Sequence, residues 1–160
     1  MKNRGMLLET ILNNTINYYF KNKLAIIEKK TLPIKFNSIN KNKDIIGGHL
    51  FAKSTVDYTG CYNGLFVAFE AKSTNKLYLP KTNIKKHQIQ YLDIINANGG
   101  KSFFIIFFSK IEEFYFIEFK QIKEYLDKSI HYKIIKKQGK KLDLIYPGII
   151  DFLPCLLENN

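Results

Sequence analysis

The stretch STVDYTGCYNGLFVAFEAK, residues 54–72, decides the fold that we expect for this chain. Its centre, Asn63-Gly64, is the strongest short-range signal for a two-residue hairpin turn, because both positions of such a turn require a positive φ. Residues 65–72 begin apolar on both faces and become polar at their end, which is typical of a central strand that reaches a site. The stretch therefore predicts a hairpin whose second strand lies inside a sheet.

The same turn predicts which residues face each other across the hairpin. Counting back from the turn along both strands places Asp57 directly opposite Glu70, with Cβ atoms about 5 Å apart. Lys72 lies two residues beyond Glu70 on the same strand, so it projects from the same face about 7 Å away. We therefore expect two carboxylates and an amine to converge. A bulge at Gly60-Cys61 would shift the register by one residue and separate them.

This trio of side chains suggests a metal site. Two carboxylates so close together repel each other unless a cation lies between them, and hard oxygen ligands favour Mg²⁺ or Mn²⁺. Magnesium held by Asp57 and Glu70 could activate water and neutralise a scissile phosphate, while Lys72 could orient the water or stabilise the transition state. The pattern thus predicts phosphodiester hydrolysis. From the spacing alone, the alternative is an exposed Glu70–Lys72 pair at a strand end, with Asp57 as a turn residue.

The composition indicates one basic domain, residues 1–160. The chain has 160 residues, of which 46% are apolar, and 25 Lys and Arg against 14 Asp and Glu give a net charge of +11. This apolar fraction suits a packed core and argues against disorder. The positive charge favours a polyanionic partner such as DNA or RNA. All the cations except Arg4 are lysines, so the codon usage of an AT-rich genome is an alternative explanation of the charge.

Several classes of protein are not expected. The longest strictly apolar run, residues 103–108, is too short to span a bilayer, and the N-terminus lacks an apolar leader. Cys61 and Cys155 form neither a disulfide framework nor a zinc motif. We therefore expect a cytoplasmic protein without a membrane partner.

Hydrophobic periodicity predicts a mixed α/β arrangement around the hairpin. The weakly patterned segment 35–53 is expected to protrude or to be mobile, and the lysine-rich segment 133–141 to form an exposed hairpin or loop. Helices are expected over 7–21, 83–98 and 119–128, and further strands over 24–28, 102–108 and 114–119. This order of elements favours an α/β sandwich about a mixed sheet.

Four separate motifs, in one order along the chain, resemble the RecU family of Holliday-junction resolvases. They are NRGMLLE at 3–9, STVDY at 54–58 with Gly60, FEAK at 69–72 and HQI at 87–89, and the similarity runs from Asn3 to about Leu153. The resemblance implies a restriction-endonuclease-like α/β core, a central mixed sheet flanked by helices, and a protruding basic stalk at about 37–53. It also implies a homodimer that cuts four-way DNA junctions with Mg²⁺ during recombination and repair.

The resemblance also implies roles for individual residues. Asp57 and Glu70 would be metal ligands, and Lys72 the catalytic lysine. Glu9 would be a third acidic group near the metal, although it equally suits the edge of an apolar helix stripe. Gln88 would border the active site, with a satisfied buried amide as the alternative.

The expected DNA contacts come from the first helix and the stalk. Arg4 is the one residue able to grip phosphate bidentately, so we expect it to border the scissile strand. The stalk offers Lys41, Lys43 and Lys53 and no Arg, which could weaken junction selectivity. Val56 stands where the family has Thr.

The expected partners are junction DNA, a second copy of the chain, and a recombinase or branch-migration protein. Two other functions stay open at this point. One is a generic nuclease of the same fold that cuts flaps or unbranched duplex, which competition among substrates would identify. The other is a junction-binding accessory protein that does not cut.

Overall fold

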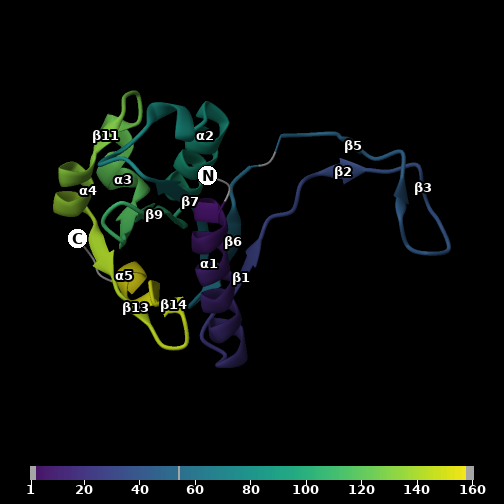
Figure 1. Cartoon of the computed structure of the whole chain (residues 1–160), viewed down its shortest axis with the longest axis horizontal. Helices are drawn as coiled ribbons and strands as arrows, with labels where there is room; N and C mark the ends of the chain where they lie inside the picture. Colours follow the sequence, from purple (N-terminus) through teal and green to yellow (C-terminus); the bar gives the residue numbers. More distant parts are fainter. Residues whose placement is uncertain (1–2, 54, 158–160) are drawn as a thin grey trace.

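The computed structural model describes residues 3–53 and 55–157, with side chains from Gly5 onward. Within these residues a six-stranded mixed sheet forms the centre of the molecule, in the order β1-β6-β7-β9-β10-β12 (Figure 1). The central strands β7 and β9 pair in parallel, and their outer neighbours pair antiparallel. The strands are β1 (Ile26–Lys29), β6 (Tyr58–Tyr62), β7 (Leu65–Thr74), β9 (Lys101–Phe108), β10 (Glu113–Glu118) and β12 (Lys140–Leu142).

Helices cover both faces of the sheet and confirm the predicted α/β sandwich. Helices α1 (Asn3–Lys21) and α5 (Leu153–Leu157) pack on one face, and α2 (Lys86–Ala97), α3 (Phe119–Ile122) and α4 (Tyr132–Gln138) on the other. The remaining short elements are the 3₁₀ helices η1 (Lys81–Asn83) and η2 (Lys123–Tyr125), the pair β8 (Tyr78–Leu79) with β11 (Ile130–His131), and the pair β13 (Leu144–Ile145) with β14 (Ile149–Ile150).

The strand β9 explains why the sheet needs helices on both sides. Phe103 faces the α1 side and its neighbour Phe104 faces the α2 side, and neither has exposed surface. Because successive strand residues point to opposite faces, a run without polar alternation requires cover on each face. The apolar run at 103–108 is therefore the centre of the core.

The predicted hairpin and its register are confirmed. Asn63 and Gly64 both have positive φ, 49° and 77°, and Tyr58 pairs with Phe69 in an unbroken ladder, so no bulge intervenes. Gly60 is required in this ladder, because a Cβ at that position would collide with the Ile26 carbonyl oxygen of β1. The uninterrupted register carries Asp57 to the level of Glu70.

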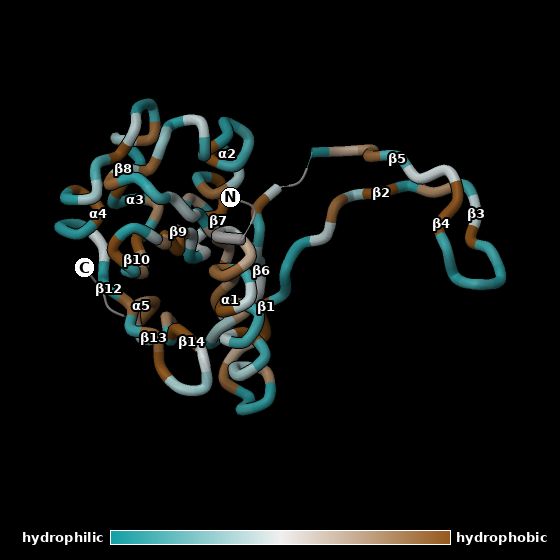
Figure 2. Tube along the Cα trace, in the orientation of Figure 1, coloured by the Kyte–Doolittle hydropathy of each residue, from teal (hydrophilic) through white to brown (hydrophobic). Residues whose placement is uncertain are grey.

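The chain between β1 and β6 leaves the body as a long arm, which we call the stalk, residues 32–53 (Figure 1). Two short antiparallel pairs hold it, β2 (Ile34–Lys35) with β5 (His49–Leu50) and β3 (Ser38–Ile39) with β4 (Ile45–Ile46). The predicted protrusion is confirmed. Basic residues share the stalk with exposed apolar residues, visible as brown stretches in Figure 2: Leu32, Ile34, Phe36, Ile39, Ile45, Ile46, Leu50 and Phe51.

Two sequence-based predictions of local structure are wrong. Segment 133–141 forms most of α4 and the start of the edge strand β12, because Ile135 and Leu142 are buried against the sheet while the lysines lie outward. The helix expected over 119–128 ends as an α-helix at Ile122 and continues only as η2. Among the described residues, no helix is both long and apolar enough to cross a membrane.

Candidate active site

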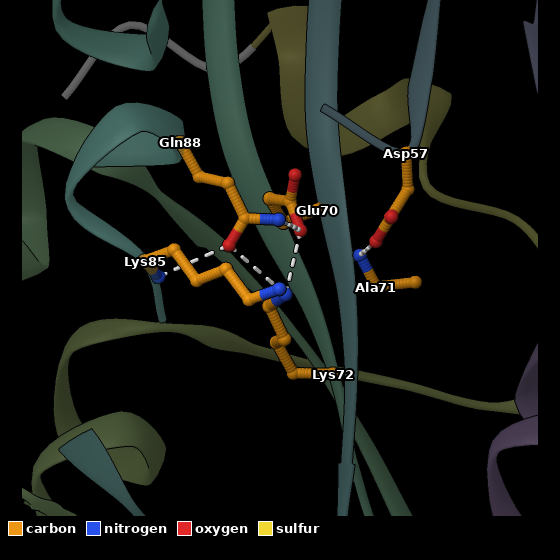
Figure 3. Close-up of polar contacts among 6 residues, drawn as sticks. All are labelled: Asp57, Glu70, Ala71, Lys72, Lys85 and Gln88. Atoms are coloured by element: carbon orange, nitrogen blue, oxygen red, sulfur yellow. Dashed lines mark hydrogen bonds and ion pairs between the residues drawn. The ribbon is translucent and has the colours of Figure 1, made fainter. Parts of the chain in front are cut away.

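Glu70, Lys72 and Gln88 form one buried hydrogen-bonded group between β7 and the first turn of α2 (Figure 3). Glu70 Oε2 lies 2.6 Å from Lys72 Nζ and accepts a 2.8 Å hydrogen bond from Gln88 Nε2. Gln88 Oε1 in turn accepts hydrogen bonds from Lys72 Nζ at 3.4 Å and from the Lys85 backbone N–H at 3.1 Å. Gln88 therefore ties the start of α2 to the side chains of β7.

Asp57 approaches this group from the neighbouring strand. It precedes β6 by one residue, and its Oδ2 accepts a 2.9 Å hydrogen bond from the Ala71 backbone N–H. The carboxylate is thus fixed beside β7 between the positions of Glu70 and Lys72. The structure brings together the four residues that the sequence placed at the catalytic centre.

The second oxygen of Glu70 accepts no hydrogen bond from the residues that the structure describes. Glu70 has no exposed surface, and its Oε1 is buried without a hydrogen bond. Burial raises the pKa of Glu70 to about 8; the ammonium of Lys72 opposes this rise, and both the charge of Asp57 and the contact of its side chain with Glu70 add to it. A buried acceptor without a partner costs about 1–3 kcal/mol. A cation bound at Oε1 would remove that cost and favour the ionised carboxylate.

Glu70 and Asp57 fit the ligand chemistry of Mg²⁺, which takes one or two protein carboxylates and completes its shell with water and substrate oxygens. Among the described residues, no group of three or more His, Cys, Asp or Glu gathers to hold a metal. Glu9 is about half exposed and forms an ion pair with Lys29. It nevertheless lines a cavity of about 280 Å³ together with Asp57. Its role as a third ligand stays a prediction.

The proposed DNA contacts are spread along the molecule. Lys53 lies at the base of the stalk and lines a groove of about 870 Å³ with Asp57 and Gln88. Lys41 and Lys43 are exposed in the loop between β3 and β4, at the far end of the stalk (Figure 1). The side chain of Arg4 lies outside the described part of the chain. Of these lysines, the structure brings only Lys53 to the site.

Comparison with known proteins identifies the family. The family model described as Recombination protein U, RecU, matches residues 3–158. The chain belongs to the RecU family. A relative named Holliday junction resolvase RecU from Mycoplasmopsis pulmonis is 43% identical, over 99% of this chain and 98% of its own length. The relative of the same name from Ureaplasma parvum is 35% identical, over 94% and 90% respectively.

A solved structure supports the fold. Hjc from Archaeoglobus fulgidus, described as a Holliday junction resolvase from an archaeal hyperthermophile, matches with a TM-score of 0.51. It is 10% identical in sequence, and the match covers 82% of this chain and 93% of Hjc. This likeness confirms the predicted α/β core, a central mixed sheet flanked by helices, for this RecU chain.

Some features of this RecU site were not found from the sequence. Two further lysines line the cavities that contain Asp57: Lys29 lines the smaller cavity, and Lys85 lines the groove. The one available signal was that Lys85 precedes the HQI motif, so it lies on the same helix start as Gln88. Val56 is buried and packs in the core on the α2 side of the sheet.

The raised pKa of Glu70 predicts how the metal-free protein responds to pH. The folded protein holds the proton on Glu70 up to about pH 8, whereas the unfolded chain releases it near pH 4.5. The stability that this proton linkage supplies is complete below pH 4.5 and is lost as pH rises through about 8. We expect the free energy of unfolding to fall between pH 5 and pH 8 by on the order of a few kcal/mol.

Urea unfolding of the metal-free protein at several pH values measures this loss. Glu70→Gln has no such proton to release, so its unfolding free energy is expected to change much less over the same range. Equal pH dependence in the two proteins would contradict the assignment.

Proposed function

We propose that this chain resolves Holliday junctions by Mg²⁺-dependent, symmetric hydrolysis of phosphodiester bonds, and that it acts as a homodimer. The observation that carries the proposal is the buried Glu70 carboxylate, whose Oε1 lacks a partner beside Asp57 and the paired Lys72. The names of the RecU relatives supply the substrate class.

Asp57 and Glu70 would hold the metal in this proposal. When bound, Mg²⁺ supplies a Lewis acid for the phosphate and a water of lowered pKa. Lys72 would lie beside the reacting phosphate, where its pair with Glu70 holds the side chain in place. Gln88 positions the side chains of Glu70 and Lys72, since its amide donates a hydrogen bond to Glu70 and accepts one from Lys72. The chain thus supplies two anionic ligands and one fixed cation.

A two-fold dimer matches the substrate. Two identical sites related by symmetry can nick two strands of like polarity at equivalent positions. Arg4, Lys41, Lys43 and Lys53 would hold phosphates, which gives affinity for backbone and shape with little base readout. The net charge of +11 supports binding of a polyanion of this kind.

The proposal is tested with an immobile four-way junction and a matched linear duplex, each end-labelled, incubated with Mg²⁺ or with EDTA. We expect paired, symmetric nicks in the junction that require Mg²⁺, and little cutting of the duplex. Equal cutting of both substrates would indicate a generic nuclease. Tight junction binding without cleavage under any divalent metal would overturn the proposal and indicate an accessory protein.

A further inference from the structure

A groove lies between the base of the stalk and the start of α2. Its volume is about 870 Å³, and it is lined by stalk residues 32 and 50–53, by Lys85, His87 and Gln88 from the α2 side, and by Asp57. The smaller cavity that contains Glu9 and Lys29 also reaches Asp57. Asp57 therefore lines both cavities, so a DNA strand that passes Asp57 can continue along the groove.

The charge in this groove is positive. Lys53 and Lys85 line it, together with the half-buried His87, and Asp57 is the one acidic residue among its described lining residues. Glu70, just behind it, is already paired with Lys72. The helix α2, which is 12 residues long, begins at the groove and adds the partial positive charge of its N-terminus. An anionic ligand is therefore favoured here.

Lys85 is an exposed cation whose backbone is held by the group around Glu70. It is the N-cap residue of α2, with an extended backbone, φ −94° and ψ 146°. Its backbone N–H donates to Gln88 Oε1, the same atom that accepts from Lys72. In Figure 3 its side chain extends from the helix start toward the ammonium of Lys72. The hydrogen bonds of Gln88 thus anchor Lys85 to the group around Glu70.

The ammonium of Lys85 lacks a counter-charge within the part of the chain that the structure describes. No carboxylate there forms an ion pair with it, whereas Lys72 is paired with Glu70. An anion bound at the Lys85 ammonium would supply the missing counter-charge. The phosphates of a DNA strand carry such charges at regular spacing.

We propose that Lys85 binds a DNA phosphate adjacent to the scissile one, on the stalk side of Asp57, and so fixes the path of the strand through the groove. This inference rests on the proposed function, because it assumes a DNA strand at Asp57 and Glu70. Lys85 is a DNA-contacting residue in this assignment, and it acts in binding before the chemical step.

The salt dependence of junction binding tests this assignment. Binding of a four-way junction is measured with EDTA present, so that cleavage does not enter, over a range of KCl concentrations. Loss of one phosphate contact is expected to reduce the slope of log K against log salt by about 0.9. We expect Lys85→Gln to show this reduction and to bind roughly tenfold more weakly at low salt. Lys85→Arg is expected to restore both values.

Lys86→Gln is the matched control. Lys86 is the next residue in the chain and is exposed like Lys85, but it does not line the groove. It has the same change in net charge, so a general effect of charge would appear equally in both variants. Equal slopes for Lys85→Gln and Lys86→Gln would overturn the inference while junction cleavage by the wild type stands. If the wild type binds no junction, both this inference and the proposed function fail.

Discussion

Glu70→Gln is expected to abolish junction cleavage while leaving the protein folded. Glutamine has the same shape, and its side-chain oxygen can accept the hydrogen bond from Gln88 that Glu70 Oε2 accepts now. It lacks the negative charge that a divalent metal needs at Oε1 and that pairs with Lys72. Because a bound metal contributes several kcal/mol of transition-state stabilisation, we expect the rate to fall on the order of 10³-fold or more.

Single-turnover cleavage of the labelled junction in Mg²⁺ measures this effect, with thermal unfolding as the check on folding. Because the metal-free protein holds a proton on Glu70 up to a pKa of about 8, glutamine replaces a neutral side chain of the same shape, and the variant is expected to melt close to the wild type near neutral pH. The matched control is Glu28→Gln, an exposed glutamate on β1, which should cut at the wild-type rate. A Glu70→Gln rate within tenfold of the wild type would refute the metal-ligand role.

Phe69→Ala is expected to cause the largest loss of stability. The Phe69 ring stacks between Tyr58 and Phe103, with centroid distances of 4.7 Å on each side, and meets Phe152 edge-on at 5.3 Å. It has no exposed surface. Removal of such a ring leaves a cavity that costs about 3–5 kcal/mol. Since domains of this kind are stable by only about 5–15 kcal/mol, the variant should lose a large share of its stability.

Urea unfolding followed by circular dichroism measures the effect of Phe69→Ala. Phe66→Ala on the same strand is the control, because Phe66 is 45% exposed and leaves no enclosed cavity; we expect it to cost less than about 1 kcal/mol. Phe69 also precedes Glu70 on β7, so the cavity is expected to loosen the site and to slow cleavage. A cost for Phe69→Ala no larger than that for Phe66→Ala would contradict the packing described.

The sequence was sufficient where local chemistry decides the structure. Asn63-Gly64 determines the turn, the turn determines the register, and the register places Asp57 beside Glu70. The unbroken apolar run at 103–108 identified the strand buried on both faces. These predictions needed no knowledge of distant residues.

The sequence did not predict the structure where packing between residues far apart in the chain determines it. The lysines of 133–141 suggested an exposed loop, and only the burial of Ile135 and Leu142 against the sheet makes this segment α4 and β12. The spacing of Glu70 and Lys72 left open an exposed pair, because the complete burial of Glu70 depends on where α2 packs. The same packing brings Lys85 to the site, which a linear pattern does not reveal; Gln88 was expected there from its HQI motif.

The position of bound Mn²⁺ tests the central claim most directly, namely that Asp57 and Glu70 together hold the divalent metal. Crystals soaked in MnCl₂ at pH 8.5, above the raised pKa of Glu70, would show the ion by anomalous scattering. We predict a peak within about 2.5 Å of Glu70 Oε1 and of an oxygen of Asp57. The account is contradicted if Mn²⁺ binds elsewhere, for example at Glu9 alone, while Glu70 keeps only Lys72 and Gln88 as partners.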